Sequence, residues 1–482
     1  METFETIVST IDDFVWGWAM IALLLGTHLY MTVRTKFIQR KIGTAIKLSF
    51  SREDKDAQGD VSQFGALTTA LAATIGTGNI VGVATGLLAG GPGAIFWMWI
   101  TGVFGIATKY AETLISVKYR VKDANGEMLG GAMYALERGF KNKILGKILA
   151  VAFAIFAFIA SFGIGASVQS NALAGVVTSY LPIEPNTSEM TWANVFIGAI
   201  LMVLVGIVIM GGIRSITRVT EKLVPIMALL YAAGCLVIIG MNWQYVGEAI
   251  SMIVVYAFTG KAAFGGAVGS GIMLALQYGF KRGLFSNESG LGSAPLVAAS
   301  ATTKNPARQA LVSMTGTFWD TVVICAVTGV TLVSTMLAHP DIQADILDGK
   351  ITAAAQLTTT AFSAIPVLGP IVLSVGMVLF TYSTMLGWAQ YGNRAVTYLF
   401  GVKGIRTYQV FFLLFVLWGT IGGGDLVWNI SDITNALMAV PNCIALIGLA
   451  AVISRVTNHY VYDGNLDEED TAEIPVIAES KA

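Results

Sequence analysis

The chain has 482 residues, of which 55% are hydrophobic and 12% charged, whereas about 25% of the residues of a soluble protein are charged. With a mean hydropathy of +0.70 and many apolar runs near the roughly 20 residues that cross a bilayer, the sequence predicts an all-α polytopic membrane protein. Its net charge of −1 and three scattered cysteines give no basis for a nucleic-acid partner, a disulfide framework or a metal cluster.

Eleven apolar segments are predicted to cross the membrane as helices. Neither a basic run nor a convincing cleavage site accompanies the first segment, so we expect it to be retained rather than removed as a signal peptide. Stretches 244–260 and 351–364 are predicted to be helical pieces in external loops, and the acidic tail after Tyr462 to be disordered and solvated. The predicted spans are 12–33, 62–90, 92–117, 147–181, 191–212, 218–241, 263–281, 308–337, 366–400, 407–421 and 425–455.

Lysine and arginine are unevenly shared between the two sets of connections. When the N-terminus is placed outside, the cytoplasmic connections contain nearly all of the 29 basic residues, and the external ones contain only Lys261 and Lys350. Cytoplasmic loops of membrane proteins are enriched in these residues. The sequence therefore predicts a multi-pass protein of the cell membrane with an external N-terminus and a cytoplasmic C-terminus.

Two glycine-rich stretches, Ala72–Gly82 (AATIGTGNIVG) and Ala267–Met273 (AVGSGIM), interrupt predicted spans. In a membrane, backbone freed from helical bonding is tolerated only where it is buried in protein or lines a cavity. Each half of the chain begins with one broken span, and the halves have five spans each in opposite orientation, which is typical of transporters with inverted repeats. The predicted divisions are an N-terminal extra helix and linker (1–61), a first repeat (62–241), an external connection (242–262), a second repeat (263–455) and an acidic cytoplasmic tail (456–482).

Two motifs carry a family resemblance. Gly90–Gly105 (GGPGAIFWMWITGVFG) and Arg282–Pro295 (RGLFSNESGLGSAP) resemble stretches of the sodium:alanine symporter family, the alanine or glycine:cation symporters, and the resemblance covers essentially the whole chain. It implies a leucine-transporter-type fold with eleven membrane helices, two of them discontinuous. It also implies import of small neutral amino acids, such as alanine or glycine, by alternating access in the lipid bilayer, with Na⁺ as the coupling ion and no other cofactor.

The first break offers oxygens on one side and amides on the other. Where the helix stops, the carbonyls of Ala72 and Ile75 lose their amide partners and become oxygen ligands for a hard cation. Where the next half-helix begins, the amides of Thr77, Gly78 and Asn79 are predicted to point into the gap and favour the carboxylate of a substrate. The alternative, that these glycines only permit close helix packing, stays open.

A second set of oxygens lies in span 366–400. The Phe380 carbonyl and the hydroxyls of Ser383 and Thr384 share one helix face, because residues three and four positions apart do so. With the two carbonyls of the first break they make five neutral oxygens, which suit Na⁺ better than a divalent ion. The resemblance supports this set, since related sodium-coupled transporters use an adjacent Ser/Thr pair in the matching span. Alternatively, these hydroxyls bond to carbonyls one turn back.

The second break is expected to face the first, so that its carbonyls accept hydrogen bonds from a substrate ammonium. Side chains near it are predicted to shape the pocket, and an amide side chain in span 147–181 is a candidate for a hydrogen bond to the substrate. For both glutamines, a polar contact between helices is an open alternative. The predicted substrate residues outside the first break are Gln169, Gly271, Ile272, Met273 and Gln277.

Few charges lie within the predicted spans. Asp320 and Asp432 are functional candidates because buried charges in a membrane are costly. Either residue could instead be structural, and for Asp320 the structural alternative is pairing with another helix. Asn287 and Glu288 are predicted to belong to an inner gate and Asp432 to an outer one, with capped turns as the alternative for the loop. Span 218–241 has no lysine at mid-membrane, which favours Na⁺ over H⁺ as the coupling ion.

Other classes of function fit less well. An enzyme would need a nucleophile–base pair or a metal cluster, and the sequence contains neither HExxH nor GxSxG at a strand–helix elbow. A channel normally repeats its filter around a symmetric pore, whereas this chain has one antiparallel pair of breaks. A transporter of the same fold that couples to H⁺ or carries a different small solute remains an alternative, since one fold serves many substrates.

Overall fold

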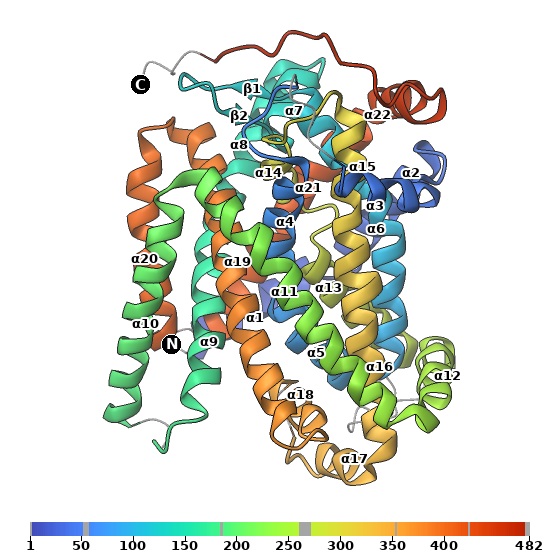
Figure 1. Cartoon of the computed structure of the whole chain (residues 1–482), viewed down its shortest axis with the longest axis vertical. Coiled ribbons are helices and arrows are strands. Elements are labelled where there is room, and N and C mark those ends of the chain that lie inside the picture. The colour runs from blue at the N-terminus through green and yellow to red at the C-terminus, as the bar shows by residue number, and fades with distance from the viewer. Residues whose placement is uncertain are drawn as a thin grey trace.

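The protein is almost entirely helical (Figure 1). The computed structural model describes residues 2–51, 57–183, 187–259, 271–351, 354–422 and 425–477. The first part contains α1 (Glu2–Val15), α2 (Trp18–Arg34), α3 (Ile42–Ser49), α4 (Gln63–Thr74), α5 (Val83–Gly90), α6 (Gly93–Lys118), β1 (Val121–Lys122), β2 (Met128–Leu129), α7 (Ala132–Gly139), α8 (Lys143–Ala160), α9 (Val168–Thr178), α10 (Ser188–Ile209) and α11 (Gly212–Met241). The second part contains α12 (Trp243–Thr259), α13 (Gly271–Asn287), α14 (Pro295–Ala298), α15 (Pro306–Thr317), α16 (Ala326–Ala338), α17 (Pro340–Leu347), α18 (Ala354–Phe362), α19 (Leu368–Phe400), α20 (Gly404–Gly422), α21 (Asp425–Gly448) and α22 (Ala450–Thr457).

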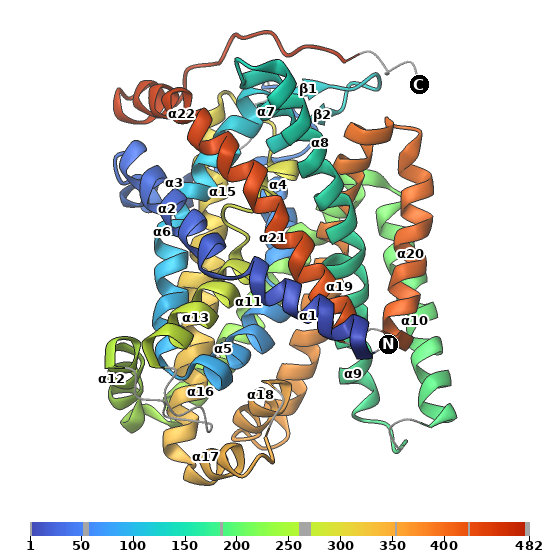
Figure 2. The same cartoon turned by 180° about the vertical axis from the view of Figure 1, so that it is seen from behind.

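The long helices run along the long axis of the molecule, which is vertical in Figure 1, and their connections gather at two ends. One end, called the basic end below, carries the antiparallel β1–β2 hairpin, α7, α22 and residues 463–477. The opposite end carries α12, α17 and α18 (Figures 1 and 2). The helical pieces predicted at 244–260 and 351–364 are therefore confirmed as α12 and α18, and they lie away from the basic end.

Nine of the eleven predicted spans are recovered as membrane-spanning candidates. Within the described residues, eight helical stretches are long and apolar enough to cross a membrane, and the bent pair α4–α5 makes a ninth. The other two predicted spans correspond to α6 and α13. With 26 residues, α6 is about 39 Å long and so exceeds the hydrocarbon thickness of a bilayer. Residues 260–270 lie outside the described residues, so α13 is seen only from Gly271 onward.

The first predicted break is present. The Ser62 hydroxyl accepts a hydrogen bond from the Gly65 amide and caps α4, which ends where Ile75 adopts an extended conformation. The chain then passes through a π-helical segment, Gly78–Gly82, into α5, and the two helices are bent by 53°. Glycine is a poor helix former, so the two glycines at 76 and 78 explain why the helix stops here.

The acidic tail differs from its prediction. The sequence predicts a disordered, solvated segment after Tyr462, but the structure lays residues 463–477 along the basic end, where side chains and backbone bind them (Figure 2). The predicted exposure is confirmed, since most of residues 463–477 are exposed, but the prediction of disorder was wrong because it judged the tail by its own composition. Its carboxylates meet Lys118 and Arg308, which are far away in the sequence.

Candidate functional site

Helix α19 crosses the first break at close range. A Cβ atom added to Gly387 would lie 2.7 Å from the backbone nitrogen of Ala73, and one added to Gly76 would lie 2.6 Å from Oγ1 of Thr384. Glycine at both positions lets the two backbones approach closely, as small residues do where membrane helices pack. As a result, the polar face of α19 lies against the end of α4.

Four of the five predicted cation ligands are brought together at this crossing. The Ser383 hydroxyl lies 2.9 Å from the carbonyl oxygen of Phe380, one turn back, and 3.4 Å from that of Ala72 across the interface. Oγ1 of Thr384 is buried and has no hydrogen-bond partner among the described residues. Ile75, at the end of α4, is also buried. A buried, unpartnered hydroxyl beside neutral carbonyls fits a monovalent hard cation, so the residues present suit Na⁺.

Replacing Gly387 with alanine is expected to destabilise this crossing, because the added methyl group would overlap the backbone of Ala73. Overpacking of this kind costs about 1–3 kcal/mol. The melting temperature of the purified protein should therefore fall. Gly175→Ala in α9 is the matched control, since a Cβ atom there has nothing within 4 Å and should not lower the melting temperature. Equal melting temperatures for the two variants would contradict the close crossing.

A buried aspartate, Asp320, is hydrogen-bonded to the first break through Asn79. Asp320 lies in the π-helical segment Phe318–Cys325, and its carboxylate accepts hydrogen bonds from Asn79 Nδ2 at 2.7 Å, Ser286 Oγ at 2.8 Å and Thr321 Oγ1 at 2.7 Å. The Asn79 side chain in turn accepts a hydrogen bond from the Gly76 amide at 2.9 Å. Asp320 therefore connects the first break to the C-terminal part of α13, as the alternative of pairing with another helix describes.

The first-break residues proposed for the substrate have different surroundings. The side chain of Asn79 is occupied by Asp320 and Gly76, and its backbone amide donates to the Gly76 carbonyl at 3.3 Å. Gly78 packs against Ser286, and Oγ1 of Thr77 is buried without a hydrogen-bond partner among the described residues. Asn79 thus shapes the break, while the Thr77 hydroxyl is left with bonding capacity.

The remaining residues predicted to bind the substrate differ in burial, and some of their side chains are exposed. Gln169 is buried, with Nε2 donating to the Ile164 carbonyl at 3.0 Å and Oε1 left without a partner among the described residues. Gln277 is half-buried, whereas the side chains of Ile272 and Met273 are 40% and 55% exposed. Gly271 has a φ of 35°, and the rest of the second break, Gly269 and Ser270, lies outside the described residues.

The predicted inner-gate loop is firmly held. Asn287 donates to Thr321 Oγ1 at 3.1 Å, and the Glu288 carboxylate accepts a 2.5 Å hydrogen bond from Ser293. The Asn287 side chain also accepts a hydrogen bond from the Ser289 amide at 2.9 Å, which is the kind of contact that the capped-turn alternative describes.

Helices on either side anchor the same loop. The Gly290 amide donates to the Glu112 carboxylate at 3.1 Å. Asn442 of α21 donates to the same carboxylate and to the Gly290 carbonyl, and Lys109 of α6 donates to the Glu288 carbonyl. The loop is therefore buried between α6 and α21.

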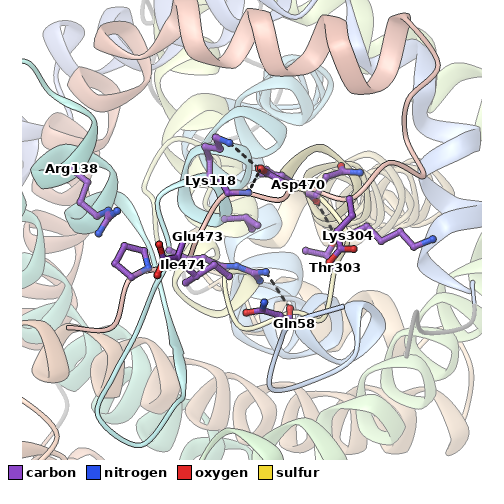
Figure 3. Close-up of a pocket in the computed structure, with 15 residues that line it drawn as sticks. Gln58, Lys118, Arg138, Thr303, Lys304, Asp470, Glu473 and Ile474 are labelled. Carbon is purple, nitrogen blue, oxygen red and sulfur yellow. Dashed lines mark hydrogen bonds and ion pairs between the residues drawn. The ribbon is translucent and has the colours of Figure 1, made fainter. Parts of the chain in front are cut away.

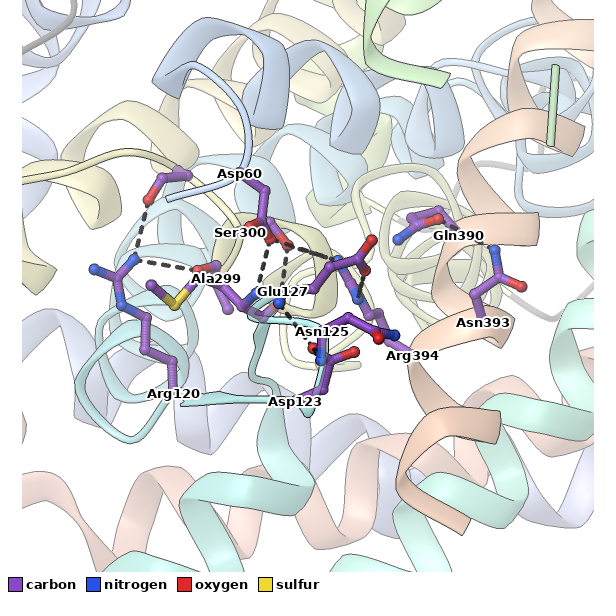
Figure 4. A network of polar contacts seen from close by, with 12 residues as sticks. Asp60, Arg120, Asp123, Asn125, Glu127, Ala299, Ser300, Gln390, Asn393 and Arg394 are labelled. Atoms are coloured by element: carbon purple, nitrogen blue, oxygen red, sulfur yellow. Dashed lines mark hydrogen bonds and ion pairs between the residues drawn. The ribbon is translucent and has the colours of Figure 1, made fainter. Parts of the chain in front are cut away.

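Sequence reasoning missed a polar network at the basic end (Figure 4). Arg394, near the end of α19 and 3% exposed, donates to Glu127 at 3.1 Å and to Ser300 at 3.0 Å, and lies 3.9 Å from Asp60. Asp60 accepts a hydrogen bond from the Met128 amide at 2.8 Å. Burial raises the pKa of Asp60 above its usual range, and the Met128 amide and the Arg394 guanidinium oppose that rise.

The network closes the basic end by joining segments from both halves. The amides of residues 60 and 61 donate to the Ser300 carbonyl, and Arg120 donates to the carbonyls of Ala299 and Ala301 and to that of Gln58 (Figure 4). The entry to α4, the hairpin, the 288–305 loop and α19 are thereby connected. A signal existed in the sequence, since Arg394 is a charge within a predicted span, but nothing in the sequence identified its partners.

Asp432, predicted to belong to an outer gate, lies in a second charged cluster. Lys281 of α13 pairs with Asp12 of α1 at 2.6 Å and with Asp432 of α21 at 3.4 Å. The indole of Trp16 donates to the Asp432 carbonyl at 3.2 Å. Helices α1 and α21 lie side by side in Figure 2. The cluster holds the N-terminal helix against the second half of the chain.

A pocket reaches the first break from the side opposite to the Arg394 network. It lies between α9, α18 and α19, and its lining includes Ile80 and Val81, in the π-helical segment of the first break, together with Tyr180 and Leu373. The first break is therefore approached by a pocket from the opposite end of the molecule, whereas the basic end is bridged by hydrogen bonds and ion pairs.

Comparisons with known proteins give a consistent result. The model of the sodium:alanine symporter family matches residues 1–473. The sodium/alanine symporter AgcS of Methanococcus maripaludis is 47% identical over 460 residues, which are 95% of this chain and 97% of the relative. The probable sodium/glutamine symporter GlnT of Bacillus subtilis is 32% identical over 467 residues, 95% of this chain and 91% of the relative.

Two solved structures share the fold. The crystal structure of MhsT in complex with L-phenylalanine is similar with a TM-score of 0.54 at 15% identity, covering 83% of this chain and 93% of that one. A Na⁺-coupled sialic acid symporter in a substrate-bound outward-open state has a TM-score of 0.53 at 11% identity, covering 91% and 98%. At such low identity these similarities concern the fold alone, and they confirm the predicted leucine-transporter-type architecture.

Proposed function

This chain belongs to the sodium:alanine symporter family, and we propose that it imports alanine or glycine together with Na⁺. Family membership makes it a multi-pass membrane transporter with Na⁺ as coupling ion, and not an enzyme. The observation that carries the proposal is that Ser383 faces the Ala72 carbonyl and Thr384 lies against Gly76, both at the first break. Alanine is the substrate in the printed name of the relative at 47% identity, and glutamine in that of the relative at 32%.

The proposed Na⁺ site consists of the carbonyls of Ala72, Ile75 and Phe380 and the hydroxyls of Ser383 and Thr384. Because these atoms come from the end of α4 and from α19, a bound cation would hold the broken helix against α19. A substrate held at the same break benefits from that arrangement, and each ligand therefore raises the affinity for the other. This reciprocity is the physical basis of the coupling.

The proposed substrate site lies on the amide side of the first break, next to Thr77 and Gly78. Two buried groups without a partner among the described residues support it: the hydroxyl of Thr77, which can donate to a substrate carboxylate, and Oε1 of Gln169, which can accept from a substrate ammonium. Asp320 would act through Asn79 and Ser286, as a positioning residue that holds the break next to α13. The residues that remain proposals for the opposite wall are Gly271, Ile272, Met273 and Gln277.

We also propose the orientation and the gating. The basic end would face the cytoplasm, because it carries most of the lysines and arginines, and the N-terminus would lie outside. The two halves, with boundaries near 62–241 and 263–455, would move relative to one another. In the arrangement seen here, the Arg394 network bridges the basic end while a pocket approaches the break from the opposite end. Import then requires that this network separate.

Uptake into proteoliposomes tests the proposal. With an inward Na⁺ gradient, radiolabelled alanine is expected to accumulate above its equilibrium level, and replacing Na⁺ by choline should abolish the accumulation. Accumulation driven by a pH gradient and indifferent to Na⁺ would favour the alternative of H⁺ coupling. Absence of alanine or glycine uptake under either gradient, with uptake of glutamine or another small solute, would keep the fold and overturn the substrate.

A further inference from the structure

The acidic tail makes two ion pairs across the basic end, and the pair between Lys118 and Asp470 is drawn in Figure 3. Asp470 lies 2.8 Å from the ammonium of Lys118, at the end of α6, and Asp467 lies 2.5 Å from the guanidinium of Arg308, in the first turn of α15. Lys118 and Asp470 are partly exposed, and the Asp467 side chain is 84% exposed. Such pairs are weakened by salt, because mobile ions screen exposed charges.

Backbone hydrogen bonds extend the same contact in both directions. The Asp470 amide donates to the Lys304 carbonyl at 2.8 Å, and the Asn305 side chain donates to the carbonyls of Leu466 and Glu468. Further along, the tail pairs with β1 in a parallel bridge. There the Lys122 amide donates to the Pro475 carbonyl and the Ile477 amide to the Lys122 carbonyl, both at 2.9 Å.

The segments that the tail joins are those of the inner network. Lys118 directly precedes the turn that contains Arg120, and Lys122 lies in the hairpin that carries Glu127, the partner of Arg394. Lys304 and Asn305 follow the loop segment that contains Ser300. The tail therefore spans the outer surface of the closed network, fixing the end of α6, the start of α15 and the hairpin at one mutual distance.

We propose that residues 463–477 form a salt-sensitive latch, which holds the basic end closed and slows its opening toward the cytoplasm. The inference rests on the proposed alternating access, in which the Arg394 network must separate during import. Because the tail holds the hairpin that carries Glu127 beside the segment that follows Ser300, it keeps both partners of Arg394 in place, and the network opens more slowly while these ion pairs are made. Ionic strength on the cytoplasmic side would then set the transport rate.

The charge-neutral double variant Asp467→Asn/Asp470→Asn tests the latch in proteoliposomes. At low internal ionic strength we expect alanine uptake about fivefold faster than wild type, since two weak pairs are lost. Raising the internal ionic strength with choline chloride, at constant Na⁺, should accelerate the wild type and leave the variant unchanged. The matched control is Glu469→Gln/Glu473→Gln, which removes the same charge from residues with no ion pair among the described residues, and it should behave like wild type.

A truncation and a peptide provide the second arm. Removing residues 464–482 should reproduce the fast uptake, and an encapsulated peptide of residues 463–477 should restore the slow rate, whereas the same peptide with both aspartates replaced by asparagine should not. Unchanged or slower uptake in both the truncation and the double variant would overturn the latch.

Hydrogen exchange separates this inference from the proposed function. In the purified protein, amides of segments 58–61 and 299–302 should exchange faster in the double variant than in the control, whatever solute is carried. If the double variant exchanges faster than the control but alanine is not taken up, the substrate assignment is overturned and the latch is still supported. Equal exchange in the two variants would overturn the latch even if transport is confirmed.

Discussion

Replacing Asp320 with asparagine is expected to reduce Na⁺-driven alanine uptake at least tenfold while the protein still inserts and folds. The carboxylate accepts three hydrogen bonds, from Asn79, Ser286 and Thr321. An asparagine side chain is neutral and offers only one acceptor oxygen, so all three donors lose a charged partner and at least one loses its acceptor, at a cost of about 1.5–3 kcal/mol. Because Asn79 also holds the Gly76 amide, the loss passes directly to the first break. Uptake rates normalised to the amount of reconstituted protein give the measurement.

The reciprocal double variant Asn79→Asp/Asp320→Asn is the control for positioning. It keeps one carboxylate and one amide in contact, and the carboxylate introduced at position 79 could still accept from the Gly76 amide. We expect it to recover part of the uptake that Asp320→Asn loses, with a melting temperature near that of wild type. A double variant as inactive as the single one, with normal melting, would show that the carboxylate acts from position 320 itself and not through Asn79.

Removal of either hydroxyl on α19 is expected to raise the Na⁺ concentration needed for half-maximal uptake about tenfold. In Ser383→Ala the oxygen that faces the Ala72 carbonyl disappears, and in Thr384→Ala the buried hydroxyl without a partner among the described residues disappears. A lost oxygen ligand corresponds to roughly 1–1.5 kcal/mol, which is about a factor of ten in affinity. Uptake measured against Na⁺ at fixed alanine gives the shift directly, and saturating Na⁺ should restore most of the rate.

Thr381→Val on the same helix is the matched control. Thr381 is buried and its hydroxyl donates to the Met377 carbonyl, one turn back in its own helix. Its removal should leave the Na⁺ dependence near that of wild type, and Thr384→Ser should lie close to wild type as well. If Ser383→Ala and Thr384→Ala shift the Na⁺ dependence no more than Thr381→Val does, the ion site lies elsewhere.

The sequence was sufficient for features that depend on local pattern. Apolar runs located the long helices, and the glycines at 76 and 78 located the first break, because both signals act over a few residues. The spacing of Phe380, Ser383 and Thr384 predicted a shared helix face, and the structure sets that face against α4. Whether these oxygens hold Na⁺ stays a prediction.

The hydrogen-bond partners of buried polar side chains could not be predicted from the sequence. Asn79 and Asp320 are 241 positions apart, and nothing in either segment indicates that they meet. The sequence predicted only that the backbone amide of Asn79 points into the gap, and it did not indicate that the side chain bonds to Asp320 and Gly76. The prediction of a disordered tail failed for the same reason, since the basic residues that bind the tail lie on α6 and α15. Pairing between distant segments is set by the fold and not by local composition.

The charged cluster around Lys281 has a consequence for biogenesis. The indole of Trp16, in the short connection between α1 and α2, donates to a carbonyl 416 positions later, and Asp12 shares Lys281 with Asp432. During synthesis the N-terminal helix therefore enters the bilayer long before α13 and α21 exist, with Asp12 lacking its final neighbours. Helix α1 can reach its final position only after almost the entire polypeptide has left the ribosome. The beginning of the chain is therefore among the last parts to pack.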